Sequence, residues 1–226
     1  MNTIKQNFNA IIAQIKQTEI RCQRTKDSVH LLAVSKNKPA TDIAQVYQLG
    51  QRHFGENYLQ EALTKQQQLT TFNISWHFIG PIQSNKTKAI ATHFQWVHSV
   101  DRLKIAVRLN EQRPQNLPPL NICLQVNISD EETKSGVNLT DLPDLITQIR
   151  LLTNLRLRGV MAIPAPQTDY ELQCLPYRKI YQAVLALNLP ELDTFSFGMS
   201  GDLEAAIVEG ATIVRIGTAL FGSRNI

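Results

Sequence analysis

One lysine of this sequence stands where an amine could act as a nucleophile. Lys36 follows the apolar run HLLAV at 30–34 after a single serine. If that run is a buried strand, the amine at its end is partly desolvated, which lowers the pKa of a lysine and leaves free amine to attack an aldehyde. Taken alone, Lys36 is interpreted more simply as a solvated residue at a strand end. Lys38 competes with it, since both face the same way if the strand continues.

Two glycine-containing turns near the end of the sequence could bind a phosphate together. Ser200 and Gly201 stand at the start of a predicted short helix, and Gly217 and Thr218 follow the last predicted strand. Backbone N–H groups at helix starts bind phosphate, and glycine lets the backbone approach it closely. The same residues are also consistent with two ordinary helix caps. The motif FGMSGD is not a nucleophile elbow, because Asp202 stands where that turn needs a glycine.

Arg215 lies within the apolar run ATIVRIG at 211–217. An arginine is unexpected there unless its charge meets a ligand or a buried partner. It either pairs with a carboxylate of the same fold or faces the ring nitrogen or an anionic group of a ligand. The histidines show no metal-ligand spacing, so we predict no metal site. His77 is expected to pack in the core or to lie at the rim of the site.

Short apolar runs alternate with amphipathic stretches along the whole chain, after an N-terminal helix over about 2–20. The predicted strands are eight: 30–35, 52–55, 75–80, 95–100, 121–127, 156–162, 193–197 and 211–217. Strict alternation of eight strands with helices or turns favours a closed (β/α)₈ TIM barrel of α/β class over an open doubly wound sheet. No GxGxxG motif follows the first strand, and no domain boundary is visible, so residues 1–226 are predicted to form one domain.

Composition narrows the classes of protein further. The chain has 226 residues, 43% of them hydrophobic and 19% charged, with a diffuse net charge of +4. That balance indicates a globular protein and does not favour nucleic acid as a partner. Three scattered cysteines suggest neither a disulfide framework nor a zinc ribbon. The N-terminus does not resemble a signal peptide, and no apolar run is long enough to cross a membrane, so we expect a cytoplasmic protein with no membrane partner.

Eight motifs appear in order across nearly the whole chain: LLAVSKNKP, FGENYLQEA, WHFIGPIQSNK, HSVDR, KSG, LRGVMAIP, SFGMSGDLEAAI and VRIGTALFG. Together they resemble the pyridoxal phosphate homeostasis protein family, small barrel proteins related to the N-terminal domain of alanine racemase. The resemblance implies a fold-type III barrel that binds pyridoxal 5′-phosphate (PLP), with the cofactor aldehyde on Lys36 as a Schiff base. By the same likeness, Ser200, Gly217 and Thr218 hold the phosphate, and Arg215 faces the pyridine nitrogen.

The resemblance also implies which other residues surround the cofactor ring. Asn57, within the motif GEN, is expected beside the cofactor, and His77, Val34 and Phe197 are expected to line the pocket. An arginine at the ring nitrogen only donates, so it leaves that nitrogen unprotonated and makes the cofactor a weaker electron sink. Racemases of this barrel type nevertheless work with such an arrangement.

Three functions are therefore compared. The first is a PLP-binding protein of vitamin B6 homeostasis that carries the cofactor to PLP-dependent apoenzymes without strong catalysis, and the resemblance implies a monomer. We favour it because the chain ends directly after the predicted barrel, whereas alanine racemases add a β domain and a tyrosine base from a partner subunit. The second is an amino-acid racemase or decarboxylase acting through Lys36. The third is a lysine Schiff-base aldolase that needs no PLP.

Overall fold

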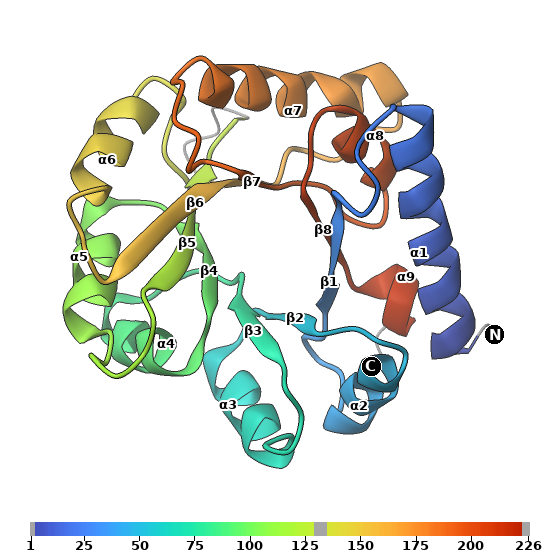
Figure 1. Cartoon of the computed structure of the whole chain (residues 1–226), viewed down its shortest axis with the longest axis horizontal. Coiled ribbons are helices and arrows are strands. Elements are labelled where there is room, and N and C mark those ends of the chain that lie inside the picture. The colour runs from blue at the N-terminus through green and yellow to red at the C-terminus, as the bar shows by residue number, and fades with distance from the viewer. Residues whose placement is uncertain (1–2, 129–134, 223–226) are drawn as a thin grey trace.

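The strands of the chain close into a barrel. The computed structural model describes residues 3–128 and 135–222, and in it eight parallel strands follow one another around the barrel in chain order, with the eighth pairing back onto the first. Figure 1 looks down on this ring, with the helices outside it. This arrangement confirms the predicted (β/α)₈ fold and excludes the open doubly wound sheet.

The strands are short, apolar and buried on both faces, as expected for a parallel sheet with helices outside and a packed interior. Their bounds are β1 His30–Val34, β2 His53–Glu56, β3 Ser75–Phe78, β4 Trp96–Val100, β5 Leu120–Val126, β6 Leu155–Ala162, β7 Thr194–Ser196 and β8 Ile213–Ile216. All eight predicted strands are present, and their bounds differ from the predicted ones by no more than two residues at either end.

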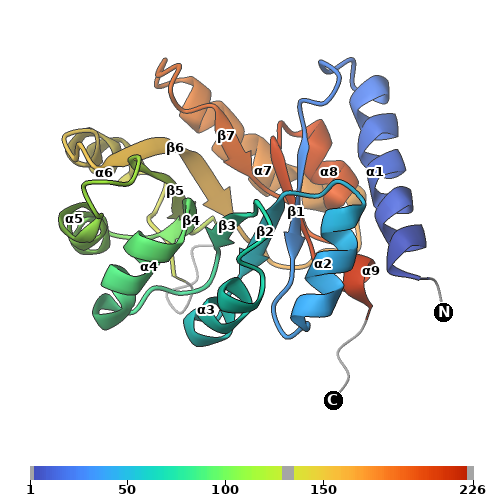
Figure 2. The ribbon, with the colours of Figure 1, turned by 60° about the horizontal axis from the view of Figure 1, so that its bottom comes forward.

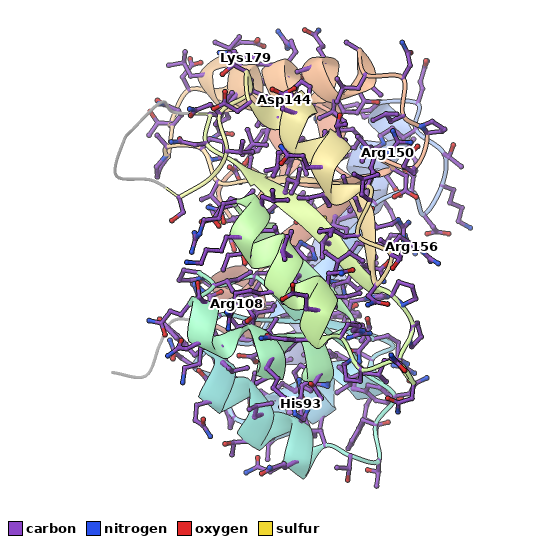
Figure 3. The ribbon with its side chains drawn as sticks, turned by 90° about the vertical axis from the view of Figure 1, so that its left-hand side faces the viewer. His93, Arg108, Asp144, Arg150, Arg156 and Lys179 are labelled. Atoms are coloured by element: carbon purple, nitrogen blue, oxygen red, sulfur yellow. The ribbon has the colours of Figure 1, made fainter. Side chains whose placement is uncertain are left out.

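Helices separate successive strands and form the outer layer, which carries charged side chains on its solvent face (Figure 3). Their bounds are α1 Ile4–Arg21, α2 Ala40–Gln48, α3 Leu59–Gln68, α4 Thr87–His93, α5 Leu103–Gln112, α6 Leu142–Ile149, α7 Tyr170–Leu185, α8 Leu203–Val208 and α9 Thr218–Phe221, with a 3₁₀ turn η1 at Ser84–Lys86. No helix within the described ranges is both long and apolar enough to span a bilayer.

The N-terminal helix α1 lies outside the regular alternation and covers the junction between the last and first units of the barrel. Thr3 caps it, with a reciprocal bond between Thr3 and Gln6. The helix packs against α8, α9 and α2, as Figures 1 and 2 both show. The side chain of Asn7 donates to the backbone carbonyl of Leu220 in α9 at 3.0 Å. These contacts tie the chain start to the segment that follows β8.

The structure differs from the sequence predictions where strands end. β1 ends at Val34 rather than continuing through residue 35, and Asn37 adopts a left-handed backbone conformation with φ of 59°. Asparagine tolerates this conformation better than most residues, so the chain turns sharply there. The polar segment SDEETKSG at 129–136 lies mostly outside the described residues.

Candidate functional site

A cavity of about 330 Å³ opens at the carboxyl ends of the strands, where TIM barrels carry their active sites. Seven of the predicted site residues line it together: Val34, Lys36, Asn57, Ser200, Arg215, Gly217 and Thr218. Four further residues complete the lining: Ile79, Ile163, Met199 and Gly201. Residues from both ends of the sequence meet there because β1 pairs directly with β8, which sets Ala33 opposite Ile216.

The two candidate lysines lie in different places. Lys36 lines the carboxyl-end cavity, whereas the amine of Lys38 donates to the backbone carbonyl of Phe221 in α9 at 3.1 Å. The left-handed turn at Asn37 separates them, since the strand does not continue beyond Val34. The premise that Lys36 and Lys38 face the same way therefore fails. Of the two, only Lys36 is among the residues around the cavity.

A buried ion pair supports the end of β1 next to Lys36. Glu56 is fully buried, and its Oε1 accepts from the hydroxyl of Ser35 at 2.6 Å and from the amine of Lys65 at 2.8 Å. The same amine donates to the backbone carbonyl of Ser35 at 2.7 Å. Burial raises the pKa of Glu56, and the charge of Lys65 opposes that rise. The network fixes the backbone directly before Lys36, and sequence reasoning did not identify it.

The predicted phosphate cradle forms where the loop after β7 meets the start of α9. Ser200 lies in this loop, two residues before the cap of α8, so it does not open a helix as predicted. Its hydroxyl accepts a long bond of 3.4 Å from the backbone N–H of Ala219. Gly217 is tightly placed, because a Cβ there would lie 3.2 Å from the carbonyl oxygen of Val34. Thr218 begins α9, so its N–H belongs to the first turn of that helix.

The carboxylate of Asp202 accepts hydrogen bonds that support the loop after β7. One oxygen of Asp202 accepts from the backbone N–H of Met199 at 2.6 Å, and the other accepts from the hydroxyl of Tyr177 at 2.7 Å. These two bonds connect the loop that carries Ser200 to α7 and to the cap of α8. Asp202, which rules out the nucleophile-elbow motif, thus has a structural contact of its own.

Arg215 is only 4% exposed and points along the inside of the barrel toward the cavity. One terminal nitrogen of its guanidinium donates to the carbonyl and to the hydroxyl of Ser196, the latter at 3.0 Å, and the other donates to the carbonyl of Ala162 at 2.9 Å. Within the described chain, its partners are thus carbonyl and hydroxyl oxygens rather than a carboxylate. Burial lowers the pKa of Arg215, but a guanidinium stays protonated in proteins and can only donate.

Asn57 is placed in the cavity by a close backbone contact. It follows β2, and its carbonyl lies so near Gly80 that a Cβ on Gly80 would sit 2.1 Å from the oxygen. Only glycine allows this approach, which joins the ends of β2 and β3. The motifs GEN and IGP of the sequence are therefore parts of one contact.

Two predicted pocket residues are not in this cavity. His77 was expected on its wall, but it lies at the amino-terminal side of the barrel interior, where it bonds to His53 and His98. The register explains this placement, because His77 pairs with Trp96, the first residue of β4. That pairing puts His77 in an interior layer near the amino ends of the strands.

Phe197 is the second correction. It is fully buried outside the barrel, where its ring stacks on Tyr177 of α7 with centroids 5.1 Å apart. Successive residues of a strand point to opposite faces. Since Ser196 points inward to Arg215, Phe197 must point outward to the helix layer. Phe197 therefore supports the loop after β7 instead of lining the cavity.

The residues missed by sequence reasoning are of two kinds. Ile79, Ile163 and Met199 are apolar wall residues, and no feature of their type or spacing separates them from core residues. Glu56 did carry a signal, because a carboxylate at the end of an apolar strand is rarely buried without a partner. The partner, Lys65, is nine residues away on α3 and could not be assigned from the sequence.

Comparison with known proteins gives concordant results. Residues 6–225 match the family described as alanine racemase, N-terminal domain. The sequence is 57% identical to the pyridoxal phosphate homeostasis protein of Pseudomonas aeruginosa, an alignment covering 100% of this chain and 97% of that protein. It is 50% identical to the protein of the same name from Escherichia coli strain K12, covering 100% and 98%.

Among solved structures, PipY of Synechococcus elongatus with PLP bound superposes with a TM-score of 0.79 at 38% identity, covering 92% of this chain and 100% of that one. The same protein without PLP gives a TM-score of 0.81.

Proposed function

The chain belongs to the pyridoxal phosphate homeostasis protein family, and from that premise we propose that it binds PLP in the carboxyl-end cavity, as a Schiff base on Lys36, and delivers the cofactor to other proteins. One observation carries the proposal. An amine, a buried guanidinium and a Ser–Gly–Thr cradle line the same cavity of about 330 Å³, although they come from opposite ends of the chain.

The residues present fit the chemistry of this cofactor. PLP supplies an aldehyde that condenses with an amine and a ring that can accept electrons from a bound carbon. Lys36 offers the amine. Ser200 offers a hydroxyl, and Gly217 and Thr218 offer backbone N–H groups at the start of a helix, a combination suited to phosphate. Arg215 supplies a fixed donor for the ring nitrogen, since its guanidinium is kept in place by the hydrogen bonds that it donates to backbone carbonyl oxygens.

The lining of the cavity supports a carrier rather than a strong catalyst. Among the described residues around it, only Lys36 and Arg215 can titrate, and Arg215 only donates. Lys36 is then the only base in the described lining. A two-base racemase needs a second group that exchanges a proton on the opposite face, and none of the described tyrosines lies in the lining. We therefore propose that turnover of amino acids is at most weak, against the alternative of a racemase acting through Lys36.

The first experiment tests the covalent site. The purified protein, reconstituted with PLP, is reduced with borohydride and mapped by mass spectrometry. We expect a visible absorbance band and a pyridoxyl adduct on Lys36. Lys36→Ala should abolish both, whereas the neighbouring control Lys38→Ala should retain them. An adduct on Lys38, or a protein that stays colourless after reconstitution, would refute the assignment.

A second experiment separates carrier from catalyst. Racemisation of alanine and other amino acids is measured beside the transfer of PLP to an apoenzyme of known cofactor requirement. We expect transfer faster than free diffusion of released PLP explains, and racemisation no faster than free PLP achieves. Turnover well above that of free PLP would favour the racemase. That the chain is a monomer and that residues 1–226 form one domain also remain predictions, which light scattering and limited proteolysis would test.

A further inference from the structure

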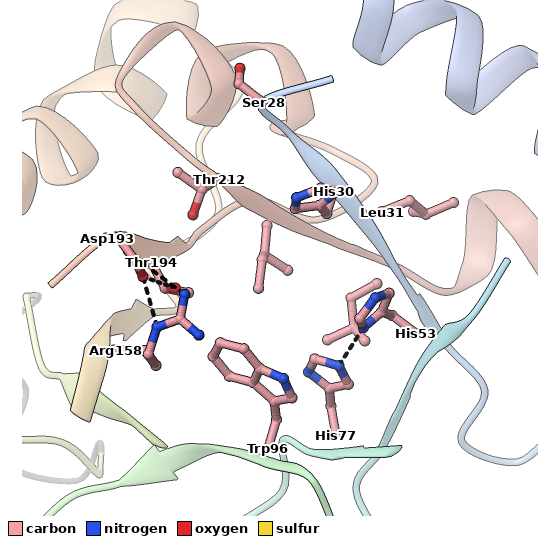
Figure 4. Close-up of a pocket in the computed structure, with 12 residues that line it drawn as sticks. Ser28, His30, Leu31, His53, His77, Trp96, Arg158, Asp193, Thr194 and Thr212 are labelled. Atoms are coloured by element: carbon pink, nitrogen blue, oxygen red, sulfur yellow. Dashed lines mark hydrogen bonds and ion pairs between the residues drawn. The ribbon is translucent and has the colours of Figure 1, made fainter. Parts of the chain in front are cut away.

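A second cavity of about 330 Å³ opens at the opposite end of the barrel, at the amino ends of the strands. Figure 4 shows it between His30, His53 and His77 on one side and Arg158, Asp193 and Thr194 on the other. This end of a TIM barrel ordinarily serves stability, and layers of branched apolar side chains fill the interior. Imidazoles, an arginine and an aspartate are therefore unexpected here, and the proposed cofactor site does not use them.

A chain of hydrogen bonds runs through the barrel from this cavity to Arg215. His53 Nδ1 lies 2.9 Å from His77 Nε2, and His77 Nδ1 lies 2.9 Å from His98 Nε2. His98 Nδ1 lies 2.8 Å from the hydroxyl of Ser196, to which Arg215 also bonds. His77 and His98 are buried, whereas His53 is exposed at the cavity mouth.

The contact with Arg215 indicates the direction in which these hydrogen bonds are donated. The Arg215 guanidinium can only donate to the Ser196 oxygen, and we infer that the hydroxyl proton of Ser196 is donated to His98 Nδ1. His98 then carries its proton on Nε2 and donates to His77, which in turn donates from Nε2 to His53 Nδ1. His53 must therefore carry its own proton on Nε2. Burial, and next the charge of Arg215, lowers the pKa of His98 to about 3, which keeps the His98 imidazole neutral at pH 7.

Other polar side chains around the cavity also carry N–H or O–H groups that have no partner among the described residues. Both oxygens of Asp193 accept from Arg158, at 3.0 and 2.7 Å, and one also accepts from the hydroxyl of Thr194. Arg158 has five N–H groups, and the described chain engages three of them. The hydroxyl of Thr212 accepts from the backbone of Phe195 and so keeps its own proton. Two N–H groups of Arg158 and the hydroxyl proton of Thr212 thus have no partner among the described residues.

The walls of the cavity are flat. Trp96 stacks on His77 with ring centroids 5.4 Å apart, and Arg158 lies over the same indole at 5.1 Å. His30 stacks on His53 at the mouth. The volume is at the lower end for small-molecule sites, which matches a ligand of one ring.

We propose that the amino-end cavity is a binding site for a small planar carboxylate, which accepts hydrogen bonds from His53 Nε2 and Arg158. The site is distinct from the proposed PLP site and lies at the other end of the barrel. The hydrogen-bond chain connects the two sites, because the proton that His53 presents is set by Arg215.

The test uses the full-length protein with ¹⁵N-labelled histidine. The imidazole ¹⁵N signals report which nitrogen of each ring carries the proton, and they report binding at His53 itself, so a carboxylate that enters the PLP site is told apart. We expect His53, His77 and His98 all to be protonated on Nε2. A His53 protonated on Nδ1 would overturn the proposal.

Binding is then titrated with benzoate and with benzamide, its neutral analogue of the same shape. We expect benzoate to shift the His53 Nε2 signal saturably and to bind at least about tenfold more tightly than benzamide, the effect typical of a hydrogen bond to a charged group. Equal binding of the two, or no change at His53, would overturn the proposal.

Two variants locate the donors. Arg158→Gln should weaken benzoate binding about tenfold, whereas Arg156→Gln, which removes the same charge two residues earlier on β6 and outside the cavity lining, should not. His53→Phe removes the second donor at an exposed position, so it tests the site even if loss of the Arg158–Asp193 pair prevents folding. Wild-type affinity in the His53 variant would contradict the proposal.

Discussion

Replacing His98 with glutamine is expected to remove a large part of the acid sensitivity of this barrel. His98 is fully buried, and burial followed by the charge of Arg215 lowers its pKa from 6.5 to about 3. The unfolded chain therefore binds a proton below pH 6.5 that the folded chain refuses until about pH 3. Stability is complete above pH 6.5 and falls as the pH drops through that window, because acid favours the state that binds more protons.

The magnitude follows from the size of the window. At pH 5 the medium is about 1.5 units below the usual pKa of histidine, and each unit corresponds to about 1.4 kcal/mol, so His98 alone destabilises the fold by about 2 kcal/mol. His77 adds to this loss, since burial also lowers its pKa well below the usual value. Two kcal/mol is a large fraction of the stability of an ordinary domain.

The assay is urea unfolding at pH 7.5 and at pH 5.0. His98→Gln is expected to lose stability at both values through altered packing, but the difference between the two should shrink by about 2 kcal/mol. His93→Gln is the control, because His93 lies exposed at the end of α4 (Figure 3). The reasoning is refuted if the His98 variant keeps the full difference, or if the wild-type protein is equally stable at both pH values.

Three further perturbations test the supports of the carboxyl-end cavity. Glu56→Gln breaks a buried ion pair and leaves the amine of Lys65 poorly compensated, so urea unfolding should show a loss of about 3 kcal/mol, and a loss below about 1 kcal/mol would contradict the assigned role. Gly80→Ala drives a Cβ against the carbonyl of Asn57, so thermal unfolding should show a clearly lower midpoint and PLP affinity should fall; an unchanged midpoint would contradict the close contact. Tyr177→Phe removes the hydroxyl that holds the loop after β7, so stability should fall by about 1 kcal/mol and PLP release should be faster, and wild-type release would show that the loop does not depend on this bond.

The sequence was sufficient for the fold and for much of the cavity lining. The spacing of apolar residues is a local property of the sequence. Eight apolar runs separated by amphipathic stretches therefore predicted eight strands and their order around the barrel. The rule that parallel strands present their carboxyl ends on one rim then brought Lys36, Asn57, Arg215 and Thr218 into one cavity. What these residues hold stays a prediction until the adduct is mapped.

Two residues that were predicted to line the cavity could not be placed by this rule. His77 and Phe197 both lie close to strand ends in the sequence, and both were expected in the cavity. Which way a strand residue points depends on the pleat, and how high it sits depends on the register with the neighbouring strand. The register with Trp96 sets His77 near the amino ends, and the inward direction of Ser196 turns Phe197 outward.

By itself, the sequence determined the barrel, its order of strands and the group of residues at its carboxyl rim, because each of these follows from local pattern and from rules of chain topology. Only the tertiary structure decided which lysine faces the cavity, which charges are buried as a pair, and that five side chains join end to end through the barrel. Those contacts join residues far apart in the chain, from His53 to Arg215, whose distances depend on strand register and side-chain direction. Neither property is encoded in the type or the spacing of the residues concerned.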